Sequence, residues 1–129
     1  MGKKCKIIID FNIKQEENFM SDKVDVGTSM AKLGKEMPRV FAGFSRFAGE
    51  VLKEDALSTK TKELITVGLA IGLNCEYCIR FHVPKAVAAG ANKAEILEAA
   101  GCAMMMGGGP ATTYAAVVLL EVLDELDVK

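Results

Sequence analysis

The chain has 129 residues, 50% of them hydrophobic and 26% charged, which suits one globular domain with one core. A formal net charge of −1 and the absence of tryptophan argue against a nucleic-acid-binding surface. Since we find neither a secretory signal nor an apolar run of membrane-spanning length, we expect a cytoplasmic protein with no membrane partner.

The first 25 residues predict a variable N-terminal extension, in which Lys6 to Phe11 is a short strand or an extended tail. A short helix is expected from Thr28 to Lys35, and Pro38 suits the first turn of the next one. That second helix places its large apolar side chains on one face at helical spacing: Val40, Phe41, Phe44, Phe47, Val51 and Leu52.

The next two helices are separated by clear stop signals. Ser58 or Thr59 can cap the N-terminus of a helix that continues to about Leu73 and is apolar on every side, which predicts a central position. Asn74 is then expected to cap a further helix that ends near Ala89 and Gly90.

The last part of the chain predicts two more helices. Asn92 and Glu95 resemble a capping box, which starts a helix that the glycines at 107–109 break. Pro110 begins the final helix, which reaches about Leu126. Residues 26–129 are therefore expected to form an all-α, single-domain bundle of about six helices.

Charge is unevenly distributed between the halves of the chain. Residues 1–64 carry 12 basic and 10 acidic side chains, whereas residues 65–129 carry only 4 and 7. So small a chain has difficulty covering that much apolar helix alone, and we therefore expect a homo-oligomer.

Two cysteines and the only histidine share one short segment. Cys75 and Cys78 are three residues apart, and His82 follows four residues later, so on a helix all three fall on one face. A thiol pair this close can form a disulfide, and a neighbouring base can lower a thiol pKa. The spacing indicates thiol redox chemistry, to which Glu63 could contribute if the two helices pack as an antiparallel hairpin.

The combination of Glu63, Cys75-x-x-Cys78 and His82 resembles the signature of the alkylhydroperoxidase D-like branch of the carboxymuconolactone decarboxylase family. The likeness covers roughly residues 28–126 and includes the segments at 56–58, 62–64, 88–90 and 95–96 and the glycine-rich break. It implies an all-helical, oligomeric fold, as trimers or hexamers, and a peroxiredoxin-type antioxidant oxidoreductase with no cofactor.

The resemblance also implies residue roles. Cys78 would attack a small peroxide and become a sulfenic acid, Cys75 would resolve it to a disulfide, and Glu63 with His82 would relay protons. A dithiol or protein-thiol reductant would restore the pair. The helix dipole alone favours Cys75 as the more acidic thiol; we follow the family because an adjacent base acts on one particular sulfur.

One position departs from the family pattern. Well-characterised peroxidases of this kind carry a second histidine between the cysteines, where this chain has Tyr77. A tyrosine side chain ordinarily keeps its proton until about pH 10, so it is a poor proton shuttle at neutral pH. We therefore expect a proton relay that is simpler or slower than in those peroxidases, and a different substrate.

Three other readings remain open at this stage. The chain could be a decarboxylase acting on a carboxymuconolactone-like substrate, although such enzymes generally lack the thiol pair. It could bind zinc through Cys75, Cys78, His82 and Glu63, or it could be a non-catalytic helical assembly module. Cys102 is expected in the core, Cys5 is expected to be incidental, and Met104–Met106 is expected to fill core and interface.

Overall fold

The computed structural model describes residues 25–129. These residues form helices joined by short connectors, and they contain no strand. The predicted all-α fold is thereby confirmed for this part of the chain. The predicted N-terminal extension and the possible strand at Lys6 to Phe11 lie outside the described residues, as does Cys5; only Asp25 of that extension is included. Its carboxylate accepts hydrogen bonds from the backbone N–H groups of Gly27 and Thr28 and so caps the first described helix.

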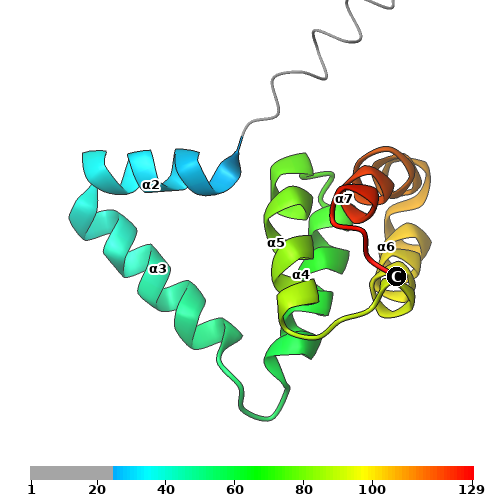
Figure 1. Ribbon diagram of the computed structural model, residues 1–129, viewed down its shortest axis with the longest axis horizontal. Helices are drawn as coiled ribbons and strands as arrows, with labels where there is room; N and C mark the ends of the chain where they lie inside the picture. Colours follow the sequence, from blue (N-terminus) through cyan, green and yellow to red (C-terminus); the bar gives the residue numbers. More distant parts are fainter. Residues whose placement is uncertain (1–24) are drawn as a thin grey trace, which may run out of the picture.

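The first two helices form an arm beside the rest of the molecule. They are α2 (Val26–Glu36) and α3 (Pro38–Leu52), and Pro38 occupies the first turn of α3 as expected. Figure 1 shows them meeting at an angle to one side of a body made of α4 to α7. Neither helix contains a buried residue, so the apolar face of α3 is not part of the core of its own chain.

Helix α4 (Thr59–Gly72) is the centre of the body, because it packs against both α5 and α6. Ser58 caps it by accepting a hydrogen bond from the backbone N–H of Thr61 at 3.1 Å, one of the two caps predicted. Val67 and Ile71 are fully buried on its inner side. Its all-round apolar sequence therefore corresponds to the central position that was expected.

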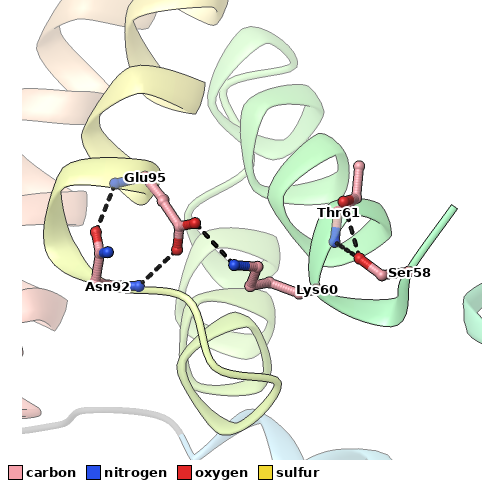
Figure 2. A network of polar contacts seen from close by, with 5 residues as sticks. All are labelled: Ser58, Lys60, Thr61, Asn92 and Glu95. Carbon is pink, nitrogen blue, oxygen red and sulfur yellow. Dashed lines mark hydrogen bonds and ion pairs between the residues drawn. The ribbon is translucent and has the colours of Figure 1, made fainter.

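A network of hydrogen bonds and an ion pair joins the start of α4 to the start of α6 (Figure 2). Asn92 and Glu95 form the predicted capping box, with reciprocal hydrogen bonds of 2.9 and 3.0 Å, and Lys60 reaches Glu95 from α4 at 2.8 Å. The side-chain hydrogen bond from Lys60, followed by the backbone hydrogen bond from Asn92, lowers the pKa of the Glu95 carboxyl below its usual value.

Helix α5 (Glu76–Ala88) begins one residue later than the sequence suggested. Asn74, the expected cap, instead adopts a left-handed backbone with φ 55°, a conformation that asparagine tolerates better than most residues. The capping residue is Cys75, whose sulfur accepts a hydrogen bond from the backbone N–H of Cys78 at 3.2 Å. At the other end, Gly90 with φ 98° follows the helix, as predicted.

Helix α6 (Lys93–Tyr114) contains a sharp kink at the predicted glycine-rich break. Gly108 has φ 66° and ψ −143°, a region that only glycine adopts readily, so the helical hydrogen bonding is interrupted between the two pieces. The chain then continues through a π-helical segment, η1 (Ala115–Leu119), into α7 (Leu120–Glu125).

The core lies where α4, α5, α6, η1 and α7 meet. Its largest fully buried side chains are Val67, Ile71, Ile79, Val83, Ile96, Leu119 and Leu123. Within the described residues, Lys93–Glu125 is the stretch that length and composition alone would allow to cross a membrane. It is kinked at Gly108, and Ile96, Leu119 and Leu123 bury its inner side in this core.

One prediction about the core was wrong, and another is confirmed only in part. Cys102 is exposed and unpaired rather than buried, because it lies at the wall of an open apolar hollow between α4 and α6. Met104 packs against the core, but Met105 and Met106 are 77% and 84% exposed. Met104 therefore fills the core as expected, and the interface role expected of the run stays a prediction.

Candidate active site

The two cysteines of the Cys-x-x-Cys segment are joined at the start of α5. Cys75 and Cys78 form a disulfide, and their Cα atoms are 5.2 Å apart. Both residues are half-buried, so the bond lies at the surface of the body rather than inside the core. The predicted pairing of the sulfurs is thereby present in the structure, in its oxidised form.

The backbone around the disulfide is fixed from both sides. The N–H of Cys75 donates to the carbonyl of Ala70 on α4 at 2.9 Å, and the N–H of Ile79 donates to the carbonyl of Cys75 at 3.0 Å. Ile79 itself is fully buried. The turn between α4 and α5 therefore holds the sulfur pair in one place relative to the core.

Glu63 and His82 meet across the α4–α5 pair. The Oε2 atom of Glu63 lies 2.9 Å from Nδ1 of His82, and the two side chains are 4% and 20% exposed. These residues are nineteen positions apart in the sequence, and the antiparallel packing of α4 on α5 brings them together, as expected. Glu63 is the one buried charged side chain among residues 25–129, and the imidazole is its partner.

This hydrogen bond determines what the imidazole can do. A carboxylate can only accept hydrogen bonds, so a carboxylate at Glu63 pairs with the His82 tautomer in which Nδ1 carries the hydrogen. In the neutral ring, Nε2 then carries the free lone pair and can accept a proton from a reacting group. A buried carboxylate that orients an imidazole in this way also stabilises the imidazolium that proton uptake creates.

His82 stands one helical turn after Cys78 on the same helix. Residues four apart are neighbours on a helix surface, with about 5–6 Å between their Cβ atoms. The structure thus assembles Glu63, His82 and the disulfide from two adjacent helices. The roles of the four residues in a reaction stay predictions.

A charged cluster that the sequence reading did not single out lies on the same stretch of α5, around Arg80. Arg80 binds Glu76 at 3.0 Å, Glu121 by a short contact, and Glu125 at 3.9 Å, which ties α5 to α7. Burial of the guanidinium lowers the pKa of Arg80, but the hydrogen bonds to Glu121 and Glu76 outweigh it and raise the pKa overall. The sequence signals were the i, i+4 spacing of Glu76 and Arg80 and that of Glu121 and Glu125.

Aromatic side chains flank the site. Phe81 meets the His82 ring edge-on, with 5.2 Å between centroids, and the ammonium of Lys85 lies 4.0 Å from the centre of the Phe81 ring. Tyr77, between the two cysteines, is 58% exposed. The position where related peroxidases carry a second histidine is therefore a surface position here.

Zinc binding gains no support from the arrangement. Within residues 25–129, no group of three or more His, Cys, Asp or Glu side chains is arranged to hold a metal ion. The sulfurs of Cys75 and Cys78, which a zinc site would need as thiolates, are bonded to each other.

Comparison with known families identifies the fold. The family model of the carboxymuconolactone decarboxylases matches residues 38–121, about two thirds of the chain. The chain belongs to the carboxymuconolactone decarboxylase family. The matched segment begins at α3 and extends into α7, so it includes Glu63, Cys75, Cys78 and His82.

Solved structures of carboxymuconolactone decarboxylase family proteins resemble this one. A member from Legionella pneumophila, solved in the apo form, is 46% identical, with a TM-score of 0.73 over 78% of this chain and 89% of that one. A member from Thermotoga maritima, described as a candidate for an antioxidative response, is 31% identical, with a TM-score of 0.63 over 67% and 88% of the two chains.

Sequence relatives cover a similar share of the chain. An uncharacterised protein of Paracoccus denitrificans, named for its place in a cox locus, is 35% identical over 97 residues, 75% of this chain and 84% of the relative. An uncharacterised protein of Cupriavidus necator is 28% identical over 95 residues, 74% of this chain and 84% of the relative. Neither relative carries an activity in its name.

Proposed function

We propose that this protein is a thiol-dependent hydroperoxidase or disulfide reductase of the antioxidant type, in which Cys75 and Cys78 alternate between dithiol and disulfide. One observation carries the proposal: the sulfur pair lies one turn from an imidazole that a buried carboxylate orients at 2.9 Å. The antioxidative description of the Thermotoga maritima neighbour agrees with it.

The first step forms a sulfenic acid. His82 takes the proton of Cys78 at Nε2, and the thiolate attacks one oxygen of the hydroperoxide, so the O–O bond breaks. The sulfur is oxidised, and the peroxide is reduced to an alcohol that receives a proton from the imidazolium. Glu63 stabilises the charged ring between these two transfers.

The second step closes the disulfide and the third reopens it. The Cys75 thiol, once deprotonated, attacks the sulfenic sulfur of Cys78 and releases water. An external dithiol, small or carried on a protein, then attacks the disulfide and leaves both cysteines reduced and itself oxidised. A reducing cytoplasm would supply such a donor, and the proposal therefore includes that location.

The test uses intact mass spectrometry and turnover with an organic hydroperoxide and a small dithiol. The reduced protein should lose two hydrogens, located by peptide mapping to the segment with Cys75 and Cys78. Cys78→Ser should abolish dithiol-supported turnover, whereas Cys75→Ser should form a sulfenic acid once, trapped by a sulfenic-acid reagent, without further turnover.

Cys102→Ser is the matched control, because it makes the same atomic change at the exposed free thiol of α6. It should behave like the parent protein. Peroxide turnover by Cys78→Ser at the parent rate would overturn the proposal. Activity on a carboxymuconolactone that persists after alkylation of all thiols would support the decarboxylase alternative instead.

A further inference from the structure

Cys75 ends one helix and begins the next. Its backbone N–H donates to the carbonyl of Ala70 at 2.9 Å, which closes α4, and its carbonyl accepts from the N–H of Ile79 at 3.0 Å, which starts α5. Asn74 allows this double role, because its left-handed backbone with φ 55° turns the chain between the two helices. The main chain therefore fixes where the Cys75 side chain lies relative to α5.

The sulfur of Cys75 occupies the place of an N-cap acceptor. It accepts a hydrogen bond at 3.2 Å from the backbone N–H of Cys78, the third residue of α5. The first N–H groups of a helix have no partner within the helix, and together they give its N-terminus a positive electrostatic potential. Negative charge on the Cys75 sulfur is therefore stabilised by the helix that this residue caps.

The other sulfur of the disulfide has a different environment. Cys78 packs against the hydrophobic core, and His82 follows it one turn further along α5. When Nδ1 of the neutral ring donates to Glu63, Nε2 has a lone pair, so it accepts a proton rather than donating one. The disulfide therefore has a base on the Cys78 side and a stabiliser of negative charge on the Cys75 side.

These two environments give the disulfide a direction of cleavage. A thiolate attacks one sulfur of a disulfide and expels the other, and the expelled sulfur leaves faster when its anion is more stable. Expulsion of Cys75 produces an anion at the N-terminus of α5. Expulsion of Cys78 would produce an anion against the core, beside an imidazole whose facing nitrogen has no proton to give.

We propose that a thiol reductant attacks the sulfur of Cys78 and that Cys75 is the leaving group. This inference rests on the proposed function and specifies its reductive step. The same stabilised Cys75 thiolate is then also the nucleophile that resolves the sulfenic acid of Cys78. The helix terminus and the imidazole of His82 thus act on different sulfurs, one on each side of the bond.

Atoms and electrons balance for a dithiol reductant. Its first thiol transfers a proton to Nε2 of His82 and forms a bond to the sulfur of Cys78, while the bond between the cysteines breaks and Cys75 takes the electron pair. The second thiol gives its proton to Cys75 and attacks the reductant's own sulfur in the mixed disulfide. Cys78 leaves with that electron pair and takes the proton of the imidazolium, so the reductant becomes a disulfide and both cysteines become thiols.

The position of the mixed disulfide tests the proposal directly. The oxidised full chain with Cys5→Ser and Cys102→Ser is mixed with the small monothiol β-mercaptoethanol, and the released cysteine is alkylated at once with excess iodoacetamide. Fragmentation of the peptide that contains both cysteines then locates the two groups. The monothiol on Cys78 with the alkyl group on Cys75 should be about ten times as abundant as the reverse arrangement.

The same mixing in urea-unfolded protein is the control. Neither the helix terminus nor the imidazole is then in place, so the two arrangements should form in comparable amounts. An adduct chiefly on Cys75 in the folded protein, or the same ratio in folded and unfolded protein, would overturn the proposal.

Hydroperoxide turnover is measured separately, because the mapping uses no peroxide. Absence of turnover with the adduct on Cys78 would contradict only the peroxidase function. Turnover with the adduct on Cys75 would contradict only the assigned direction of cleavage.

A second experiment removes the hydrogen bond to the Cys75 sulfur. In the full chain with Cys5 and Cys102 changed to serine, Cys78→Ser keeps the backbone N–H and Cys78→Pro removes it. Position 78 lies in the first turn of α5, where this N–H has no helical partner to lose. In the folded Cys78→Ser protein, alkylation of Cys75 should reach half its maximal rate about one pH unit or more lower than in the urea-unfolded protein.

The Cys78→Pro protein should lose most of this shift. Equal shifts in the two variants, or no shift on folding, would contradict the stabilised anion. Circular dichroism shows whether the proline variant keeps its helices. If it does not, the Cys78→Ser protein and the position of the mixed disulfide decide the question.

Discussion

At Glu63 the chain places a carboxylate in the core of the body and gives it one partner, the imidazole of His82. The hydrogen bond fixes which ring nitrogen faces the rest of the site, and burial removes competing water. In the mechanism proposed above His82 is the general base, and general acid–base catalysis typically contributes about 10²–10⁴-fold to a rate.

Replacing Glu63 by glutamine should therefore slow disulfide formation in the reduced protein by about a hundredfold. The amide still reaches Nδ1, but it lacks the charge that stabilises the imidazolium. The rate should be measured by stopped-flow mixing with peroxide across pH 5–9, together with the thermal midpoint of the variant.

Glu98→Gln, which changes an exposed carboxylate of α6, is the control and should leave the rate unchanged. A Glu63→Gln variant with the parent's rate and pH profile would remove Glu63 from the relay. A lower thermal midpoint with an unchanged rate would assign the pair a purely structural role.

Glu95 links stability to pH. Because Lys60 lowers its pKa in the folded state, this carboxylate stabilises the fold above its unfolded pKa, near 4.5, and the contribution is lost as the pH falls through the lower folded pKa. Glu95→Gln should therefore lower the urea midpoint at pH 7 and have a smaller effect at pH 3. Equal destabilisation at both pH values would contradict this linkage.

Several single residues could be predicted from the sequence, since local rules decide them. The Asn92–Glu95 capping box depends only on residues three apart. The meeting of Glu63 and His82 required one further assumption, antiparallel packing. Cys102 was misplaced because cysteine is usually buried, and the sequence does not say which face of an apolar helix its neighbours cover.

At the scale of the element, α6 depends on one backbone conformation. The φ of 66° and ψ of −143° at Gly108 interrupt the helix and redirect the chain toward η1. The break was predicted from three consecutive glycines, and the structure places it at Gly108, the one of the three with a positive φ.

Gly108→Ala should destabilise the protein by about 1–3 kcal/mol, because an L side chain is strained at that backbone conformation. Gly109→Ala is the matched control: a Cβ there meets nothing within 4 Å and its φ is not positive. It should be neutral or stabilise by up to about 1 kcal/mol. Urea denaturation of both variants checks the difference, and similar effects at the two positions would contradict the strain.

Helix α3 illustrates what periodicity leaves undecided. Its apolar face was predicted correctly as helical, but a one-sided apolar pattern is the same whether the helix packs on its own core or on another chain. The start of α5 was predicted one residue early because asparagine suits both an N-cap and a left-handed turn, and Asn74 adopts the turn.

For the whole molecule, stability depends on a small core shared by α4 to α7. Leu119 is fully buried in it, while the adjacent Leu120 is 42% exposed. Leu119→Ala should cost about 2–5 kcal/mol, the range for truncation of a buried leucine. Leu120→Ala should cost less than half as much in the same urea titration; equal costs would mean that another surface covers Leu120.

The family and the all-α class could be recognised from the sequence because the spacing of Glu63, Cys75, Cys78 and His82 is specific. The separation of the α2–α3 arm from the body could not be recognised from the sequence. It depends on how the connector between Leu52 and Thr59 turns, and the hydrogen bonds that fix this turn involve side chains with no distinctive pattern.

The Cα atoms of Cys75 and Cys78 are 5.2 Å apart, close to the roughly 5 Å that helical geometry gives any two residues three positions apart. Interconversion of the disulfide and the dithiol, a two-electron change, therefore requires little movement of the main chain. Amide hydrogen exchange along α5 should hardly differ between the two redox forms, and the pace of cycling should depend on sulfur chemistry rather than on refolding.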